Sequence, residues 1–192
     1  MLKIAHRINT LAQLRDTPAH LGVEIDLRDR GGRIILHHDA FSDGEDFDAW
    51  LDGYQHAFMI LNTKCEGLEN ALLEKMAARG IKDFFFLDLS IPFMVKQVRK
   101  GVREIAVRFS EYEPAELALR FAGQVEWVWV DCFRDLPLDA AAYALLKPHF
   151  RFCLVSPELQ GHDPLARIPE FRRRLEGMAI DAVCTKRPDL WA

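Results

Sequence analysis

The chain has 192 residues, of which 49% are hydrophobic and 28% charged, and its formal net charge is −4. These values are typical of a soluble globular protein, and we expect one domain over residues 1–192. The net negative charge does not favour binding to nucleic acid or to an anionic membrane. We also expect no signal peptide and no membrane span.

Short β-rich runs alternate with helical patterns along the whole chain. In order, we expect a strand over 3–8, a helix around 10–14, strands over 22–27 and 33–38, and a helix over 46–55. Strand and helix then alternate over 57–64, 67–79, 83–90, 92–100, 104–110, 114–122, 125–133, 138–146, 151–156, 168–176 and 180–185. Several helical patterns stop at a glycine, a common helix end, as at Gly80, Gly101 and Gly123.

The pair Gly31 and Gly32 separates the second and third runs. Two-residue hairpin turns need positive φ, which glycine adopts easily, so we expect these runs to form a β-hairpin. Without the hairpin's return arm, eight strands remain and nearly every one is followed by a helix. This alternation predicts an α/β fold with parallel strands, and we expect a compact (β/α)8 TIM barrel with a β-hairpin after the second strand.

Four cysteines, Cys65, Cys132, Cys153 and Cys184, lie far apart, without a Cys-x-x-Cys pair. This spacing argues against a zinc site or a redox motif. Three of them lie in apolar stretches, which suits reduced core residues of a cytoplasmic protein.

The second strand places two acids on one face. Alternation turns Val23 and Ile25 toward the helices and therefore Glu24 and Asp26 toward the inside of the barrel. Two buried carboxylates are unfavourable unless a cation or hydrogen-bond donors compensate them, and a divalent ion with oxygen ligands would do so.

Polar residues recur near the carboxyl ends of other predicted strands, where TIM barrels carry their active sites. They include Asn62, Lys64, Arg108, Trp129 and Asp131. Each also has a purely structural interpretation. For example, Lys64 could pair with a neighbouring acid, Arg108 could be the counter-ion of Asp131, and His6 could be a buried core residue. Their joint placement at strand ends favours a functional site.

The stretches AHRINTLAQL and GVEIDLRDRGGRIILHHD resemble the opening of the glycerophosphodiester phosphodiesterases, a family related to phosphatidylinositol-specific phospholipase C. The matching motifs are His6-Arg7, Glu24-x-Asp26, Gly31-Gly32 and His38-Asp39. The end of the chain, IDAVCTKRPDLW, resembles the end of that family.

The resemblance implies a mechanism and a ligand for each matching residue. His6 and His38 would be the general base and acid, since imidazole titrates near neutrality. Mg²⁺ or Ca²⁺ would be held by Glu24 and Asp26, with Asn62 as a neutral third ligand. Arg7 and Lys64 would contact the phosphate oxygens. Arg108, Trp129 and Asp131 are candidates for the pocket of a small-molecule substrate.

The sequence departs from the family pattern in several places. Ile8 stands directly before Asn9, where the family has glycine and a longer loop. Asn62 replaces a glutamate ligand, and Lys186 replaces an aspartate near the end. The insertion that follows His-Asp in the family and helps to hold glycerol has little room here.

These features predict a metal-dependent phosphodiesterase that acts in lipid metabolism on something other than a plain glycerophosphodiester. A second interpretation is an inactive relative that only binds a phosphorylated small molecule, which would bind without metal and show no turnover. A third is an unrelated barrel enzyme, such as an aldolase with Lys64 as a Schiff-base nucleophile. The third leaves the histidines and acids unexplained.

Overall fold

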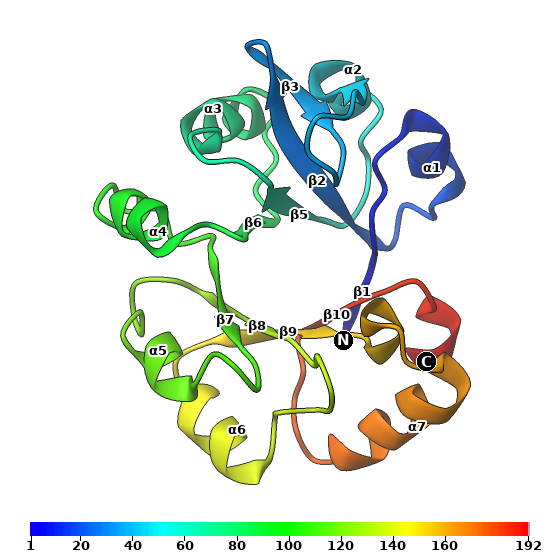
Figure 1. Ribbon diagram of the computed structural model, residues 1–192, viewed down its shortest axis with the longest axis vertical. Helices are drawn as coiled ribbons and strands as arrows, with labels where there is room; N and C mark the ends of the chain where they lie inside the picture. The colour runs from blue at the N-terminus through cyan, green and yellow to red at the C-terminus, as the bar shows by residue number, and fades with distance from the viewer. Residues whose placement is uncertain (192) are drawn as a thin grey trace. The chain divides into compact units, whose positions relative to one another are not determined.

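The computed structural model describes residues 1–191 and consists of short strands that alternate with helices (Figure 1). The strands are β1 (Leu2–Ala5), β2 (Gly22–Arg30), β3 (Arg33–Leu36), β4 (Glu45–Asp46), β5 (Phe58–Thr63), β6 (Phe84–Leu87), β7 (Ala106–Phe109), β8 (Trp127–Val130), β9 (Arg151–Val155) and β10 (Ala182–Thr185). The α-helices are α1 (Leu11–Asp16), α2 (Phe47–Leu51), α3 (Glu69–Ala78), α4 (Ile91–Val98), α5 (Ala115–Leu119), α6 (Ala140–Leu146) and α7 (Pro164–Arg174). Two 3₁₀ helices are η1 (Pro157–Gln160) and η2 (Pro188–Trp191).

The chain divides into two units, one of residues 6–102 and one of residues 1–5 with 103–192. In the first unit, β2 pairs in parallel with β5, and β5 pairs in parallel with β6. On its other side β2 pairs antiparallel with β3, which pairs antiparallel with β4. The carboxyl ends of β2, β5 and β6 therefore lie at one edge of this sheet.

The β2–β3 hairpin forms as the two glycines predict. Gly31 has φ +61° and Gly32 has φ +85°, the left-handed conformations that a two-residue hairpin turn needs. Leu27 lies opposite Leu36 in this ladder and the His37 N–H donates to the Asp26 carbonyl, so the return strand brings His37 and His38 alongside Asp26.

Local sequence signals explain where the helices of this unit begin and end. Thr10 and Gln13 form a capping box at the start of α1. The Asp46 carboxylate caps α2 by accepting a hydrogen bond from the Ala49 N–H. Gly80 has φ +67° just beyond α3, as expected for a C-terminal glycine.

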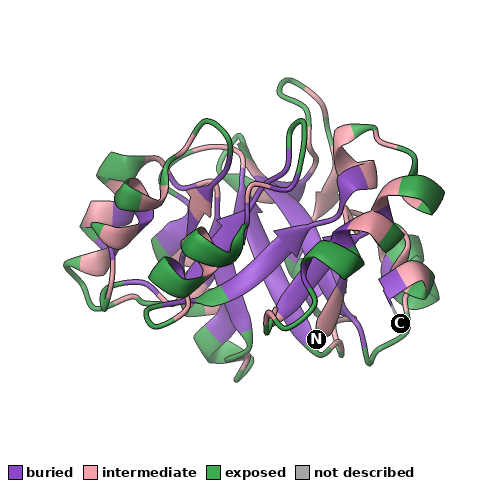
Figure 2. Ribbon diagram, turned by 90° about the horizontal axis from the view of Figure 1, so that it is seen from below, coloured by how far each residue is buried: buried purple, intermediate pink, exposed green. Residues whose placement is uncertain are grey.

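The second unit holds an all-parallel sheet in the order β1-β10-β9-β8-β7. Such a sheet needs apolar cover on its faces, and strand residues such as Val128 and Leu154 are fully buried. Figure 2 shows the strands of both units buried and the helices exposed on their outer sides. Phe171 of α7 contributes a fully buried ring.

The expected helix over 168–176 begins four residues earlier, at Pro164. The Asp163 carboxylate accepts from the Leu165 N–H, and Pro164 occupies the first turn, where its missing N–H is not needed. Leu165 is 65% exposed, so the first turn lacks the apolar periodicity from which the sequence-based boundary was drawn. β2 runs three residues beyond its expected end, most other strands are shorter than expected, and β4 and both 3₁₀ helices were not predicted.

The mixed α/β class predicted from the sequence is confirmed, whereas closure of the strands into one barrel and a single domain remain predictions. Three cysteines expected in the core, Cys132, Cys153 and Cys184, are buried and unbridged. Over residues 1–191, every helix is too short or too polar to cross a membrane.

Candidate active site

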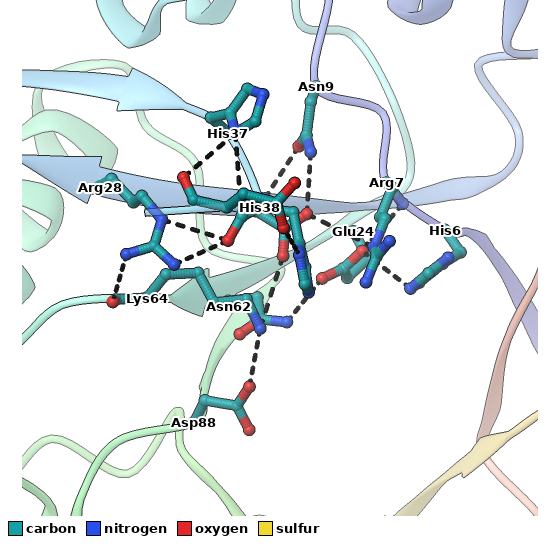
Figure 3. Close-up of polar contacts among 12 residues, drawn as sticks. His6, Arg7, Asn9, Glu24, Arg28, His37, His38, Asn62, Lys64 and Asp88 are labelled. Carbon is teal, nitrogen blue, oxygen red and sulfur yellow. Dashed lines mark hydrogen bonds and ion pairs between the residues drawn. The ribbon is translucent and has the colours of Figure 1, made fainter. Parts of the chain in front are cut away.

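The candidate site lies at the carboxyl edge of β2, β5 and β6. In the ladder Asp26 is paired with Asn62, which is paired with Leu87. Lys64 and Asp88 follow directly after the ends of their strands, so four polar side chains from three neighbouring strands meet at this edge (Figure 3).

Two buried carboxylates form the centre of the site. Glu24 is 1% exposed and Asp26 is fully buried, as the alternation on this strand predicts. Glu24 Oε2 accepts from the Arg7 backbone N–H at 2.8 Å, and Glu24 Oε1 accepts from Asn62 Nδ2 at 2.8 Å (Figure 3). Glu24 therefore links the segment after β1 to the end of β5.

Burial and the neighbouring acid disfavour the ionised form of Glu24. Burial, followed by the nearby charge of Asp26, raises the pKa of Glu24 to about 7. The hydrogen bonds from Asn62 and Arg7 act in the opposite direction and only partly offset this effect.

Asn9 is a site residue to which the sequence reasoning gave no role. Its Nδ2 donates to Asp26 Oδ2 at 2.8 Å, and its Oδ1 accepts from the Asp26 backbone N–H at 2.9 Å. This two-point contact fixes the carboxylate of Asp26 in place. The Asn-Thr that follows His-Arg was part of the family resemblance and was the available signal.

Lys64 lies between two carboxylates. Its Nζ is 2.9 Å from Asp88 Oδ2 and 3.5 Å from Asp26 Oδ1. Asp88 has φ +64°, a left-handed conformation that is uncommon outside glycine and is strained. The pairing of Asp88 with Lys64 was not predicted.

The oxygen atoms of the site fit a hard divalent cation. Within residues 1–191, Asp26 Oδ1 and Asn62 Oδ1 are buried and have no hydrogen-bond partner. Together with Glu24 they offer carboxylate and amide oxygens, the ligands that Mg²⁺ and Ca²⁺ prefer. Over the same residues, no group of three His, Cys, Asp or Glu side chains is placed to hold a metal ion, and Asn62 contributes an amide rather than an acid.

His38 carries a carboxylate partner of its own. Its Nδ1 is 2.8 Å from Asp39 Oδ1, and this hydrogen bond is the main reason that the pKa of Asp39 is lowered. A carboxylate on Nδ1 orients the imidazole and leaves Nε2 for proton transfer. His37 points to the opposite side, with its ring bonded to the Asp39 backbone (Figure 3).

The remaining predicted residues of this unit lie around the acids. His6 Nε2 is 3.8 Å from Glu24 Oε2, and Arg7 Nε is 3.8 Å from Asp26 Oδ2. Arg7 has φ +58°, which lets its backbone N–H bond Glu24 while its guanidinium stays near Asp26. Arg7 and His38 line the same open groove of about 540 Å³.

The three predicted pocket residues belong to the other unit. Arg108 Nη1 is 2.6 Å from Asp131 Oδ2, which agrees with the structural alternative in which Arg108 is the counter-ion of this acid. Asp131 Oδ1 also accepts from Gln160 Nε2 at 2.7 Å, and Trp129 is only 5% exposed.

Comparison with solved structures identifies the fold. A protein from Agrobacterium tumefaciens str. C58, assigned as a glycerophosphoryl diester phosphodiesterase, matches with a TM-score of 0.71 and 16% identity over 99% of this chain and 95% of its own. The chain shares the fold of the glycerophosphodiester phosphodiesterases. A glycerophosphodiester phosphodiesterase from the same strain matches with a TM-score of 0.67 and 15% identity, over 100% of this chain and 99% of its own. A glycerophosphoryl diester phosphodiesterase from Parabacteroides distasonis ATCC 8503 matches with a TM-score of 0.63 and 12% identity, over 98% of this chain and 84% of its own.

These matches confirm the sequence resemblance as a likeness of fold over nearly the whole chain. No protein family model matches the sequence, and no curated protein matches it. At 12–16% identity the structural similarity supports a shared fold only. The roles of individual residues depend on the geometry of the site itself.

Proposed function

We propose that this protein is a metal-dependent phosphodiester hydrolase of the glycerophosphodiester phosphodiesterase type. One observation carries the proposal: His6, Arg7 and Lys64 lie against Glu24 and Asp26, and His38 lines a groove with Arg7, in a chain with that fold. A closed (β/α)8 barrel is part of the proposal, as is a small-molecule diester substrate in a cytoplasmic setting.

The proposed reaction uses both histidines. His6 removes the proton from an attacking hydroxyl, a bond forms from that oxygen to phosphorus, and the bond to the leaving alcohol breaks. His38, oriented by Asp39, gives its proton to the departing oxygen. Arg7 and Lys64 bind the non-bridging oxygens of the phosphate.

Glu24, Asp26 and Asn62 would hold the divalent cation. When bound, the ion would neutralise charge that develops on the phosphate oxygens. The burial of the two carboxylates supports this assignment, because buried acids are unfavourable unless a cation or hydrogen-bond donors compensate them. Neutral Asn62 makes the affinity for the cation lower than a third acid would.

The substrate differs from a plain glycerophosphodiester in this proposal. Only a short loop, residues 37–44, connects β3 to β4 after the His38-Asp39 motif, and α2 follows at once. The insertion that helps the family to hold glycerol has no counterpart there. A diester of a different alcohol or of a sugar fits this more open arrangement.

The test is hydrolysis of bis(p-nitrophenyl) phosphate and a panel of glycerophosphodiesters with Mg²⁺, Ca²⁺, Mn²⁺ or EDTA. Turnover should require metal and should fall at least about 100-fold in His38→Ala, the usual scale for loss of a general acid. His20→Ala is the matched control, since this histidine is exposed and outside the site, and it should keep wild-type turnover.

A second candidate function is binding of a phosphorylated small molecule without turnover. It is favoured by the hydrogen bond from Asn62 to Glu24 and by the pairing of Lys64 with Asp88, which give these side chains protein partners without a metal. Phosphate binding that persists in EDTA, with no hydrolysis from folded protein under any condition, would select this function over the first.

A further inference from the structure

Arg28 ties together two segments that carry functional residues. It lies on β2, two residues after Asp26 and on the same side of the strand. Its Nη2 and Nε donate to the His38 carbonyl oxygen at 2.7 and 3.2 Å, and its Nη1 donates to the Lys64 carbonyl oxygen at 3.0 Å (Figure 3). One guanidinium thus holds the backbone of His38 on one side and of Lys64 on the other.

The hydrogen bonds of Arg28 lie just beyond the last backbone hydrogen bonds that join β2 to β3 and to β5. The His37 N–H donates to the Asp26 carbonyl at 3.0 Å, and the Lys64 N–H donates to the Leu27 carbonyl at 2.8 Å. β3 ends at Leu36 and β5 ends at Thr63, so the chain leaves the sheet on both sides of β2 just here. The Arg28 side chain supplies the next hydrogen bonds on each side.

We propose that Arg28 is a positioning residue that sets the placement of the His38 imidazole and the Lys64 ammonium at the phosphate site. This inference rests on the proposed function. Hydrogen bonds from a charged donor are about twice as strong as neutral ones, so the two carbonyls are held firmly. A fixed carbonyl limits where the side chain of the same residue can reach.

Only arginine has the geometry for this task. The planar guanidinium offers five donors in a fixed fork and reaches two acceptors on opposite sides at once. Lysine would keep the charge but has a compact ammonium, and glutamine has a single amide with two N–H groups. Substitution by either should therefore loosen one or both of the segments.

The experiment compares Arg28→Lys and Arg28→Gln with the wild type. We expect kcat/KM to fall about 100-fold, the usual scale for a displacement of about 1 Å in a catalytic group. We expect both kcat and KM to change: a lower kcat would reflect displacement of His38, and a higher KM would reflect displacement of Lys64. The limb of the pH–rate profile that reports on His38 should also move.

Two readouts do not depend on turnover. NMR should show the His38 ring resonances shifted in the Arg28 variants, and calorimetry should show inorganic phosphate bound about tenfold more weakly through Lys64. If the wild type binds phosphate but hydrolyses no diester, the proposed function fails while this test of Arg28 still stands.

Arg30→Gln is the matched control. Arg30 is two residues further along β2; it donates to the loop carbonyl of Phe41 at 3.5 Å and lies 3.9 Å from Asp43 Oδ1, so it contacts neither His38 nor Lys64 in these bonds. It should leave kinetics, phosphate affinity and the His38 resonances unchanged. The inference is overturned if folded Arg28→Gln matches Arg30→Gln in all three measurements, or if its losses equal the loss of folded protein measured by circular dichroism.

Discussion

Lys64 Nζ is 2.9 Å from Asp88 Oδ2, so the cation proposed to bind phosphate is already paired with a carboxylate. Both side chains are largely buried, and this strengthens their attraction relative to a surface pair. Asp88 also holds a strained left-handed backbone at the end of β6, which its surroundings must impose. A phosphate that binds Lys64 has to compete with Asp88.

We predict that Asp88→Asn binds inorganic phosphate more tightly than the wild type, by roughly five- to tenfold. Asparagine keeps the shape and tolerates positive φ, so the change removes mainly the negative charge. Isothermal titration calorimetry measures the affinity directly. Asp52→Asn serves as the control, because it neutralises an exposed acid paired with Arg79. Weaker phosphate binding in Asp88→Asn would mean that Asp88 orders Lys64 and does not compete for it.

The second prediction concerns Asn62, whose Nδ2 donates to Glu24. Asn62→Glu places a third carboxylate beside the buried pair, and like charges disfavour the metal-free fold. We expect lower thermal stability in EDTA and a larger gain in Tm on adding Mg²⁺ or Ca²⁺, since the cation then has three acidic ligands. Differential scanning fluorimetry with and without metal measures both effects.

Asn62→Gln is the control for that change, because glutamine has the length of glutamate without its charge. It should not increase the Tm gain from metal. An equal Tm gain in Asn62→Glu and Asn62→Gln would argue against a cation at Asn62.

The third prediction follows from Glu24, whose pKa is raised from 4.5 to about 7 in the folded state. Between these two values the folded protein binds more protons than the unfolded chain, so the free energy of unfolding falls as pH rises. The contribution is fully present below pH 4.5 and is lost by about pH 7. A shift of this size corresponds to a loss of roughly 3 kcal/mol.

Urea denaturation in EDTA at several pH values between 4.5 and 8 measures this dependence. Glu24→Gln cannot ionise, so its free energy of unfolding should fall less over the same window. Identical pH dependence in the two proteins would show that Glu24 does not titrate in this range.

Regular patterns predicted much of the fold and the centre of the site. Alternation placed Glu24 and Asp26 on one buried face, because a strand has a strict two-residue period. The glycine pair predicted the hairpin, because few other residues accept positive φ at two adjacent positions. These features depend on local backbone chemistry, which a sequence displays directly.

Contacts between side chains and distant backbone were not predicted. Arg28 bonds two carbonyl oxygens, and every residue has a carbonyl, so no residue pattern marks its partners. The left-handed backbone of Arg7 has no sequence signal either, since arginine does not favour it. The early start of α7 was signalled by Asp163 and Pro164, but apolar periodicity appears only later in that helix.

The fourth prediction tests the hairpin that brings His38 to the acids. Gly32 has φ +85° and open space where a Cβ would stand, so Gly32→Ala adds backbone strain and no clash. We expect the free energy of unfolding to fall by about 1 kcal/mol, the usual penalty for a side chain in this conformation. Gly53→Ala is the matched control, because a Cβ there makes ordinary contacts, at 3.4–3.5 Å. Urea denaturation measures both, and an equal small effect in the two variants would mean that the turn relaxes to another type.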